Sequence, residues 1–185
     1  MPDAGRPAPG LDGRIADEHR SNYLEHMRLV PEPVAVIATS DGKSRAGLAA
    51  TAWNSLSIDP PTLLVCVNRN ASAHPVIQRA GAFSVNLLRA EDADSLEIFS
   101  SKRGLRGDDR FLTGVWTTGP EGQPIMKDAV VSFECKLEDM HDHSSHTILI
   151  GTVGQIMGRR DGAAMLYLNG MSIQAAIPEG FEEEK

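Results

Sequence analysis

The residues whose types and spacing could do chemistry lie in one stretch of the chain, residues 49–72. A Pro-Pro pair at 60–61 divides this stretch, and the short apolar segment after the pair ends on polar and basic residues. Small side chains before the pair would let a ligand approach the backbone closely. This order is a plausible bed for a flat, anionic cofactor. The residues before the Pro-Pro pair that could contact such a cofactor are Thr51, Ala52, Trp53, Asn54 and Ser55, all small or polar except Trp53.

The end of this stretch could hold the charged part of such a cofactor. Arg69 supplies a positive charge, and Asn68, Asn70 and Ser72 supply polar groups around it. Ser72 suits the N-cap of a helix that runs to Ala80. A phosphate binds well where unpaired N–H groups of a helix N-terminus meet a basic side chain. The alternative is an ordinary capped helix with an exposed arginine.

A group of histidines lies just before a later apolar segment. His141, His143 and His146 stand close to the carboxylates of Asp139 and Asp142. Imidazoles and carboxylates are common metal ligands, and alternate residues of an extended loop can converge on one ion. No cysteine partner and no helical His-x-x-x-His pair accompanies them. A metal site is therefore the lesser alternative, and we predict that the chain holds no metal.

Composition narrows the class of protein further. A chain of 185 residues with 41% hydrophobic residues can bury one substantial core, so we expect one domain. The formal net charge of -7 argues against nucleic-acid or anionic-membrane partners, with the basic run 102–106 as the one exception. Cys66 and Cys135 are too few for a disulfide scaffold and lie in apolar segments, which favours buried free thiols.

The two ends of the chain differ from its middle. Residues 1–14 are rich in Pro, Gly and charge, so we expect them to be disordered, and they lack the apolar core of a signal peptide. No apolar run approaches the length that spans a bilayer, and we expect a cytoplasmic protein. The domain should cover residues 15–177, and residues 178–185 should form a frayed acidic tail.

Periodicity and turn signals predict a mainly-β chain with a few short helices. Asp41-Gly42 predicts a hairpin turn, and Gly81 suits a helix C-terminal cap after Pro75 in the first turn. Many short strands with short helices suggest an antiparallel closed barrel with the helices packed outside it. The predicted helices cover residues 16–29, 72–80 and 93–100, the strands cover 34–40, 47–52, 63–68, 83–88, 130–137 and 147–156, and charged or polar loops cover 101–109 and 141–145.

Several segments in this order resemble those of the short-chain flavin reductase family, the flavin-binding split-barrel proteins that supply reduced flavin to two-component monooxygenases. The resemblance runs from about Met27 to about Met171. It implies a mainly-β fold with α, an antiparallel split β-barrel with short flanking helices, and a homodimer with flavin near the subunit interface. The segments that carry it are Val34–Thr39, Ala49–Arg69, Phe83–Leu88, Arg110-Phe111, Glu134-Cys135 and His146–Val153.

The resemblance also implies roles for individual residues. Backbone groups of residues 51–55 would face the flavin ring edge, residues 68–72 would line the phosphate side, and His146 would place the nicotinamide. Lys102 and Arg103 could close over the phosphate. The family usually has Gly-Asp before this histidine, whereas this chain has Ser144-Ser145, which bears on nicotinamide geometry and on NADH-versus-NADPH preference. Secondary candidates for the pocket walls are Phe83, Asn86, Phe99, Arg110 and Phe111.

The implied activity is that of an NAD(P)H:flavin oxidoreductase. NADH or NADPH would reduce bound FAD or FMN by hydride transfer, and the reduced flavin would leave for a partner monooxygenase. No Gly-x-Gly-x-x-Gly follows a strand candidate, which agrees with a transient nicotinamide. No Gly-x-Ser-x-Gly elbow is present, which argues against a hydrolase. The alternatives are a flavin-binding electron-transfer or sensor protein that retains its flavin, and a reductase of another small acceptor such as a corrinoid or metal chelate.

Overall fold

The computed structural model describes residues 13–158 and 162–176. In these residues three α-helices and one 3-10 helix accompany the strands: α1 (Gly13–Met27), α2 (His74–Ala80), α3 (Ala93–Phe99) and η1 (Gly107–Phe111). The strands are β1 (Glu32–Pro33), β2 (Ala35–Ser40), β3 (Arg45–Ala50), β4 (Trp53–Ile58), β5 (Pro61–Asn68), β6 (Ala82–Leu87), β7 (Trp116–Thr118), β8 (Pro124–Met126), β9 (Val131–His143), β10 (His146–Gly158), β11 (Ala164–Leu168) and β12 (Met171–Ala175).

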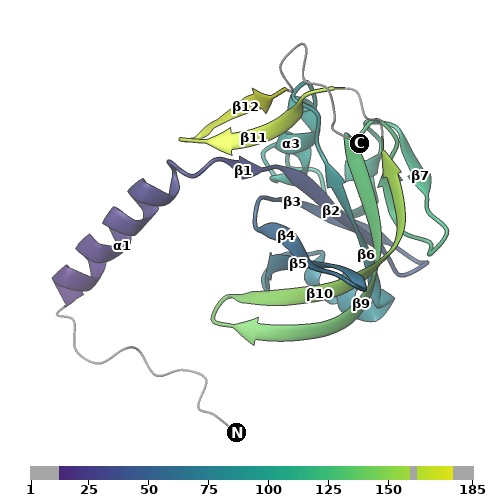
Figure 1. The fold of residues 1–185 in the computed structure, drawn as a ribbon, viewed down its shortest axis with the longest axis horizontal. Helices are drawn as coiled ribbons and strands as arrows, with labels where there is room; N and C mark the ends of the chain where they lie inside the picture. Colours follow the sequence, from purple (N-terminus) through teal and green to yellow (C-terminus); the bar gives the residue numbers. More distant parts are fainter. Residues whose placement is uncertain (1–12, 159–161, 177–185) are drawn as a thin grey trace, which may run out of the picture.

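The main sheet has seven antiparallel strands in the order β3-β2-β6-β9-β10-β5-β4 (Figure 1). Two small sheets, β1-β11-β12 and β7-β8, lie beside it. The prediction of a mainly-β antiparallel fold with short helices is confirmed. The prediction of a closed barrel is wrong in one respect, because no described ladder joins the edge strands β3 and β4. The sheet is therefore open along these two edges.

Strand β2 separates two apolar clusters, and this is why its side chains are buried on both faces. Ile37 faces the first cluster, together with Phe83 and with Val76 of α2. Val36 faces the second cluster, which Phe99 of α3 helps to form. Side chains of a strand alternate between its two faces, so β2 and its neighbour β3 form the wall between the clusters. Helix α2 packs on this wall from the side of the first cluster, and helix α3 packs on it from the side of the second.

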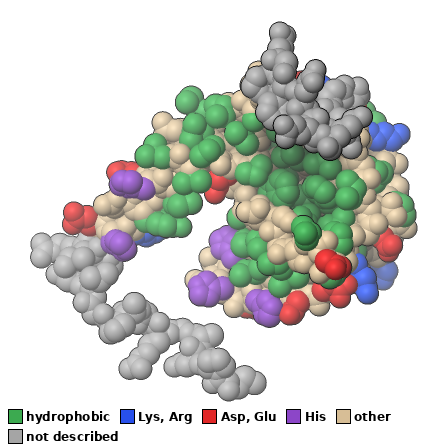
Figure 2. Space-filling model, viewed as in Figure 1, with side chains coloured by type: hydrophobic (Ala, Val, Ile, Leu, Met, Phe, Trp, Pro, Cys, Tyr) green, Lys and Arg blue, Asp and Glu red, His purple; other side chains and the backbone are tan. Residues whose placement is uncertain are grey.

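Helix α1 confirms the helix that was predicted over 16–29, although it ends at Met27. It projects away from the sheets (Figure 1), and every side chain from Asp17 to Pro31 is exposed. Tyr23 is 60% exposed and Leu24 is 49% exposed. Hydrophobic side chains are visible along this helix in Figure 2. These apolar side chains of α1 therefore stay exposed in the single chain.

Several boundaries differ from the prediction. Strand β3 begins at Arg45 rather than at residue 47. Trp53–Ile58, to which the prediction assigned no strand, forms strand β4 and pairs with β5, so the Pro-Pro pair lies at the hairpin turn between the two strands. The predicted loop 141–145 shrinks to the turn Ser144-Ser145, since β9 continues to His143. The expected disorder of residues 1–14 and the expected acidic tail lie almost wholly outside the described residues.

The caps of α2 were predicted with partial success. Gly81 is the C-cap with a left-handed φ of 63°, and Pro75 lies in the first turn, as predicted. The prediction for Ser72 is wrong, because the N-cap is Ala73, it has helical backbone angles, and no side chain caps the helix. Ser72 lies one residue before the cap, in the turn that joins β5 to α2.

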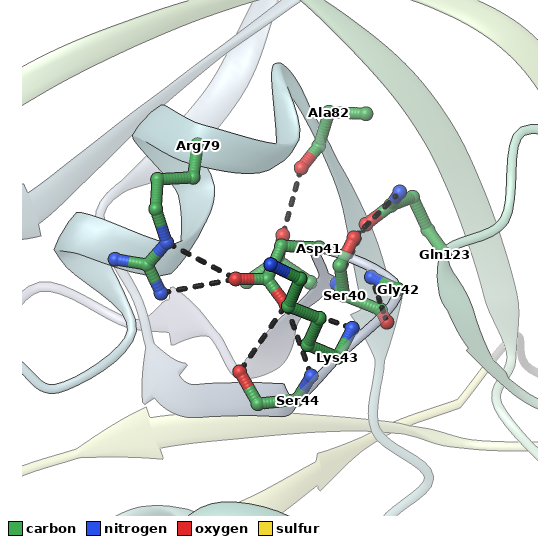
Figure 3. Close-up of polar contacts among 9 residues, drawn as sticks. Ser40, Asp41, Gly42, Lys43, Ser44, Arg79, Ala82 and Gln123 are labelled. Carbon is green, nitrogen blue, oxygen red and sulfur yellow. Dashed lines mark hydrogen bonds and ion pairs between the residues drawn. The ribbon is translucent and has the colours of Figure 1, made fainter.

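The turn between β2 and β3 confirms the Asp41-Gly42 signal and is tied to α2 (Figure 3). Asp41 accepts hydrogen bonds from the backbone N–H of Ser44 at 2.9 Å and of Lys43 at 3.1 Å. Its other carboxylate oxygen accepts the Arg79 guanidinium at 3.0 Å. Because Arg79 belongs to the last turn of α2, this carboxylate fixes the position of α2 relative to the start of β3.

This turn predicts how stability depends on pH. The N–H groups of Ser44 and Lys43, and then Arg79, hold the pKa of Asp41 at about 2, below its ordinary 3.8. A lowered pKa in the folded state contributes stability above pH 3.8, and this contribution is lost as the pH falls toward 2. We expect Asp41→Asn to lower Tm at pH 7 and the gap to wild type to shrink between pH 4 and pH 2. A gap that stays constant over this range would contradict the assignment.

Candidate functional site

Three cavities follow one another around β3, the β5-to-α2 turn and the end of β9–β10. The first, the edge cavity, has a volume of about 380 Å³ and includes Glu32, Ala49, Thr51, Ser100 and Lys102. The second, the arginine cavity, has a volume of about 470 Å³ and includes Arg45, Asn70, Ser72, Ser101, Arg106 and Arg110. The third, the polar cavity, has a volume of about 510 Å³ and includes Arg69, Asn70, His74, Gln78, Asp142 and Ser145.

The edge cavity lies against the open edge of β3. The carbonyl of Gly47 accepts a hydrogen bond from Arg110 at 2.8 Å, so this residue turns its backbone groups away from β2. Alternate residues of an antiparallel edge strand share this direction, which places the backbone N–H and C=O of Ala49 on the same open edge. Thr51 follows and donates its hydroxyl to Glu32 at 2.7 Å. The cavity thus offers backbone groups with close access.

Gly47 is required for this edge to pack. A Cβ at this position would lie 2.8 Å from Cε1 of Phe99 and 3.1 Å from the carbonyl oxygen of Ile37. Both distances are shorter than an ordinary van der Waals contact. The absence of a side chain therefore lets the Phe99 ring pack directly on β3. Phe99 in turn contacts Phe111 and Trp116, with ring centroids 5.3 and 5.5 Å away.

Arg110 lines the arginine cavity and connects its wall to β3. It is 6% exposed, and besides Gly47 it donates to the carbonyl of Leu105 at 2.9 Å and to the hydroxyl of Ser101 at 2.7 Å. Burial lowers the pKa of Arg110, and the neighbouring charge of Arg106 lowers it further. Two guanidinium groups that repel one another at a cavity wall favour an anion there.

The other two arginines of this cavity differ in their pairing. Arg45 forms an ion pair with Asp108 at 2.6 Å and lies 4.9 Å from the centroid of the Phe111 ring. The side chain of Arg106 makes no hydrogen bond or ion pair with any residue that the structure describes. Arg106 is therefore the guanidinium best able to contact a phosphate. It was not predicted as a site residue from the sequence. Its place in the basic run 102–106 was the only signal in the sequence.

The polar cavity contains a hydrogen-bond chain that runs from buried His74 to exposed Asp142. His74, 9% exposed, lies 2.8 Å through Nε2 from the hydroxyl of Thr147, and this hydroxyl donates to Asp142 at 2.6 Å. Since the hydroxyl has one proton, Nε2 of His74 must be the donor to Thr147. The Thr147 hydrogen bond lowers the pKa of Asp142, and the charges of Arg69 and His74 lower it further. Asp142 is thus an ionised acceptor at neutral pH.

The cavities bring together part of the predicted set. Thr51 lines the edge cavity, Asn70, Ser72 and Arg110 line the arginine cavity, and Arg69 lines the polar cavity. Lys102 lines the edge cavity, whereas Arg103 is bound to Asp94 and Glu97, each at 2.7 Å. The structure places the following predicted residues outside these three cavities: Ala52, Trp53, Asn54, Ser55, Asn68, Phe83, Asn86, Phe99, Phe111 and His146.

The hydrogen bonds of Asn86 show why it lies outside the three cavities. Its Nδ2 donates to the Val36 carbonyl at 3.0 Å and to the Ser84 hydroxyl at 2.9 Å. Its Oδ1 accepts from the Met126 N–H at 2.9 Å and from the Ser132 hydroxyl at 2.8 Å. These bonds use its whole capacity, so Asn86 has no polar group left for a cofactor. Its role here is to join β2, β6, β8 and β9.

His146 is exposed at the start of β10. Its neighbour Thr147 is buried, so His146 points to the opposite, outer face of the β9–β10 hairpin. In the sheet it is paired with His143 of β9 on one side and with Asn68 of β5 on the other. Its Nδ1 lies 2.9 Å from the Ser145 hydroxyl. The structure does not bring His146 next to the edge cavity of its own chain in any contact that it records.

The alternative of a metal site finds no support in the residues that the structure describes. The described residues contain no group of three or more His, Cys, Asp or Glu side chains placed to hold a metal, and His141 instead contacts Asp139 at 2.9 Å. Cys135 is buried, and burial with the nearby Glu134 raises its pKa to about 12. Both cysteines are free, as predicted. Within residues 13–158 and 162–176, no helix combines the length and apolar character that a membrane crossing requires.

The open edge of β3 lies beside an arginine-rich cavity, and this arrangement suits a flat, phosphorylated ligand. Comparison with known proteins agrees: residues 27–175 match the family "Flavin reductase like domain", and the chain belongs to this family. One relative is the FMN reductase (NADH) RutF of Agrobacterium fabrum, 36% identical over 159 residues, which span 86% of this chain and 90% of the relative.

Two further proteins are similar to this chain. The 4-hydroxyphenylacetate 3-monooxygenase reductase component of Salmonella dublin is 28% identical over 151 residues, covering 82% of this chain and 89% of the relative. The NADH:FAD oxidoreductase SgcE6 of Streptomyces globisporus, solved with NAD and FAD fragments, matches with a TM-score of 0.79 at 26% identity and covers 94% of this chain and 100% of that chain. The resemblance that the sequence predicts is thus confirmed.

Proposed function

We propose that this protein is an NAD(P)H-dependent flavin reductase that reduces FAD or FMN and supplies the reduced flavin to a partner monooxygenase. The relatives named FMN reductase (NADH) and monooxygenase reductase component support this activity. Within the chain, the observation that carries it is the adjacency of the edge cavity and the arginine cavity. Ser100 and Ser101 are consecutive residues, and one lines each cavity.

The residues present fit a flavin. The backbone of Ala49 and the side chain of Thr51 would hold the edge of the ring in the edge cavity. Arg106, with Arg45 and Arg110 behind it, would hold the phosphate in the arginine cavity. Between Ala46 and Ala50 the strand spans about 13 Å, enough to separate ring from phosphate. Unpaired guanidinium charge and unpaired strand-edge amides are the donors that such a ligand requires.

A bound flavin supplies the hydride chemistry, accepting hydride at N5 from nicotinamide C4. The chain's own contribution is to orient and to stabilise charge. Backbone N–H groups at the open edge of β3 would stabilise negative charge on the ring edge, as donors do in an oxyanion hole. Lys102 at the rim of the edge cavity adds positive potential to the same place. The apolar Val34 and Leu96 form the dry side of the cavity and exclude water.

We also propose a split-barrel fold and a homodimeric assembly for this chain. The seven-stranded sheet, open between β3 and β4, would be the split barrel of this family, and the protein would act as a homodimer. The exposed apolar side chains of α1 support association, since Tyr23, Leu24 and Met27 stay uncovered in the single chain.

Steady-state oxidation of NADH with catalytic protein and excess free flavin tests the proposed function. We expect many turnovers per protein molecule, with the rate rising with added flavin. A protein that retains its flavin as a sensor or carrier would not turn over added flavin. The Ser144-Ser145 sequence before His146 is the feature that favours that second function. Loss of NADH oxidation beyond one equivalent per bound flavin would replace the first proposal with the second.

His146 gives a specific prediction for the nicotinamide. His146→Ala is expected to lower the rate of hydride transfer or to raise KM for NADH about tenfold, the cost of one lost hydrogen bond of about 1.4 kcal/mol. The flavin Kd should not change, because His146 lies outside the arginine and edge cavities. His143→Ala is the matched control, since His143 is the exposed cross-strand neighbour. Unchanged kinetics in His146→Ala would remove this residue from the mechanism.

A further inference from the structure

The polar cavity continues the proposed flavin site on the side away from the ring. Asn70 lines both the arginine cavity and the polar cavity, so the two are neighbours across one side chain. The three cavities therefore follow in the order edge, arginine, polar. The sequence predicted a phosphate near Arg69 and Asn70, considered Asp142 only as a possible metal ligand, and gave no role to His74 or Gln78 in binding.

The charges of the two cavities differ, and this difference indicates different ligands. The arginine cavity has three guanidinium groups, with Arg45 paired to Asp108. In the polar cavity the single guanidinium of Arg69 lies 3.7 Å from the carboxylate of Asp142, so the formal charges cancel. A neutral cavity rich in donors and acceptors suits an uncharged, polyfunctional group rather than a second phosphate.

The polar cavity is also built in advance. His74 is more than nine-tenths buried, and its Nε2 is engaged by Thr147, so Nδ1 is the ring atom that can address the cavity. Thr147 fixes Asp142 through the bond at 2.6 Å. Gln78 comes from the next turn of α2, four residues after His74, and lies on the same side of the helix. Together these residues present an imidazole nitrogen, a carboxylate and a carboxamide.

We propose that the polar cavity binds the adenosine half of FAD, and that FAD rather than FMN is the preferred flavin. Adenosine is neutral and combines an exocyclic amine, ring nitrogens and ribose hydroxyls, which match a carboxylate, a carboxamide and an imidazole. With the ring in the edge cavity, the two phosphates lie among the arginines and the adenosine reaches the polar cavity. This inference rests on the proposed flavin reductase function, because the order of the three cavities has meaning only for a bound flavin.

The nicotinamide substrate carries an adenosine as well, so the same chemistry has two sources. FAD is favoured because the polar cavity adjoins the arginine cavity directly through Asn70. His146, the residue proposed for the nicotinamide, faces the opposite side of the β9–β10 hairpin from Thr147 and Asp142. The experiment below separates the two sources.

The test compares the Kd values of FAD and FMN by fluorescence titration of the full-length protein. We expect wild type to bind FAD at least tenfold more tightly than FMN. Gln78→Ala and Asp142→Ala should each weaken FAD binding about tenfold, the equivalent of one hydrogen bond, and leave the FMN Kd unchanged. Gln155→Ala, an exposed glutamine on β10 outside the cavity, is the matched control and should change neither value.

Each other outcome overturns the inference in a recognisable way. Equal Kd values for FAD and FMN in wild type, or variants that weaken both flavins equally, would refute the adenosine site and leave the reductase proposal standing. Variants that raise KM for NADH without changing the ratio of FAD to FMN affinity would assign the polar cavity to NADH instead. Failure of wild type to bind either flavin would refute the proposed function as well.

Discussion

Arg110→Met is expected to weaken flavin binding on the order of 100-fold and to lower the free energy of unfolding by about 2–4 kcal/mol. Methionine fills much of the same space but leaves the carbonyls of Gly47 and Leu105 without the donors they have at 2.8 and 2.9 Å. The loop that carries Arg106 would lose its attachment to β3. Urea unfolding measures the loss in the free energy of unfolding, and fluorescence titration with FMN measures the flavin Kd.

Two further arginine variants separate binding from folding. Arg106→Met should weaken flavin binding about tenfold and leave stability near that of wild type, because its side chain is exposed and forms no recorded ion pair. Arg103→Met is the matched control, since its charge is already bound to Asp94 and Glu97 outside both cavities. Wild-type flavin affinity in both Arg110→Met and Arg106→Met would mean that the phosphate binds elsewhere.

Gly47→Ala is the second change with a large expected effect. The added Cβ would lie 2.8 Å from Phe99 and 3.1 Å from the Ile37 carbonyl oxygen, so either α3 or β3 must move. We expect a loss of about 1–3 kcal/mol in the free energy of unfolding, as in other overpacked cores. The flavin Kd should rise about tenfold, because the displaced edge of β3 carries Ala49 and the Arg110 contact.

The control for Gly47→Ala is another glycine of the same sheet. Gly154 lies in β10, and a Cβ there would meet its nearest neighbour, the Glu134 carbonyl oxygen, at 3.9 Å. Gly154→Ala should therefore leave stability within about 0.5 kcal/mol of wild type and leave flavin binding unchanged. Equal, small effects of both substitutions on stability would contradict the packing of Phe99 on β3 that the structure describes.

Local signals account for the parts of the fold that the sequence predicts well. Asp41 accepts hydrogen bonds from the N–H groups of the residues two and three positions later. The turn is therefore specified within four consecutive residues. Gly81 takes a left-handed φ that few other residues adopt cheaply. Strand β4 lacks such signals, because its exposed polar residues such as Asn54 and Ser55 resemble a loop and its pairing depends on β5. An edge strand with little burial is difficult to predict for this reason.

The site depends on contacts between residues far apart in the chain, and these are what the sequence hides. Arg110 and Gly47 are 63 positions apart, and their hydrogen bond attaches Arg110 to the open edge of β3. Asn86 was a secondary candidate for the pocket wall from the family resemblance, but its hydrogen-bond network spans four strands. Thr51 was predicted from its place among small and polar residues and from the family resemblance, and neither signal pointed to its contact with Glu32.

Amide chemical-shift mapping by NMR tests the central claim most directly. The chain is 19.9 kDa, and FMN is added stepwise to the labelled protein. We predict that the largest shifts fall on the amides of Ala49, Thr51, Ser72, Ser101 and Arg106, along the edge and arginine cavities. Shifts confined to β4 or to the outer face of the β9–β10 hairpin, with these five amides unmoved, would show that the flavin does not bind at the open edge of β3.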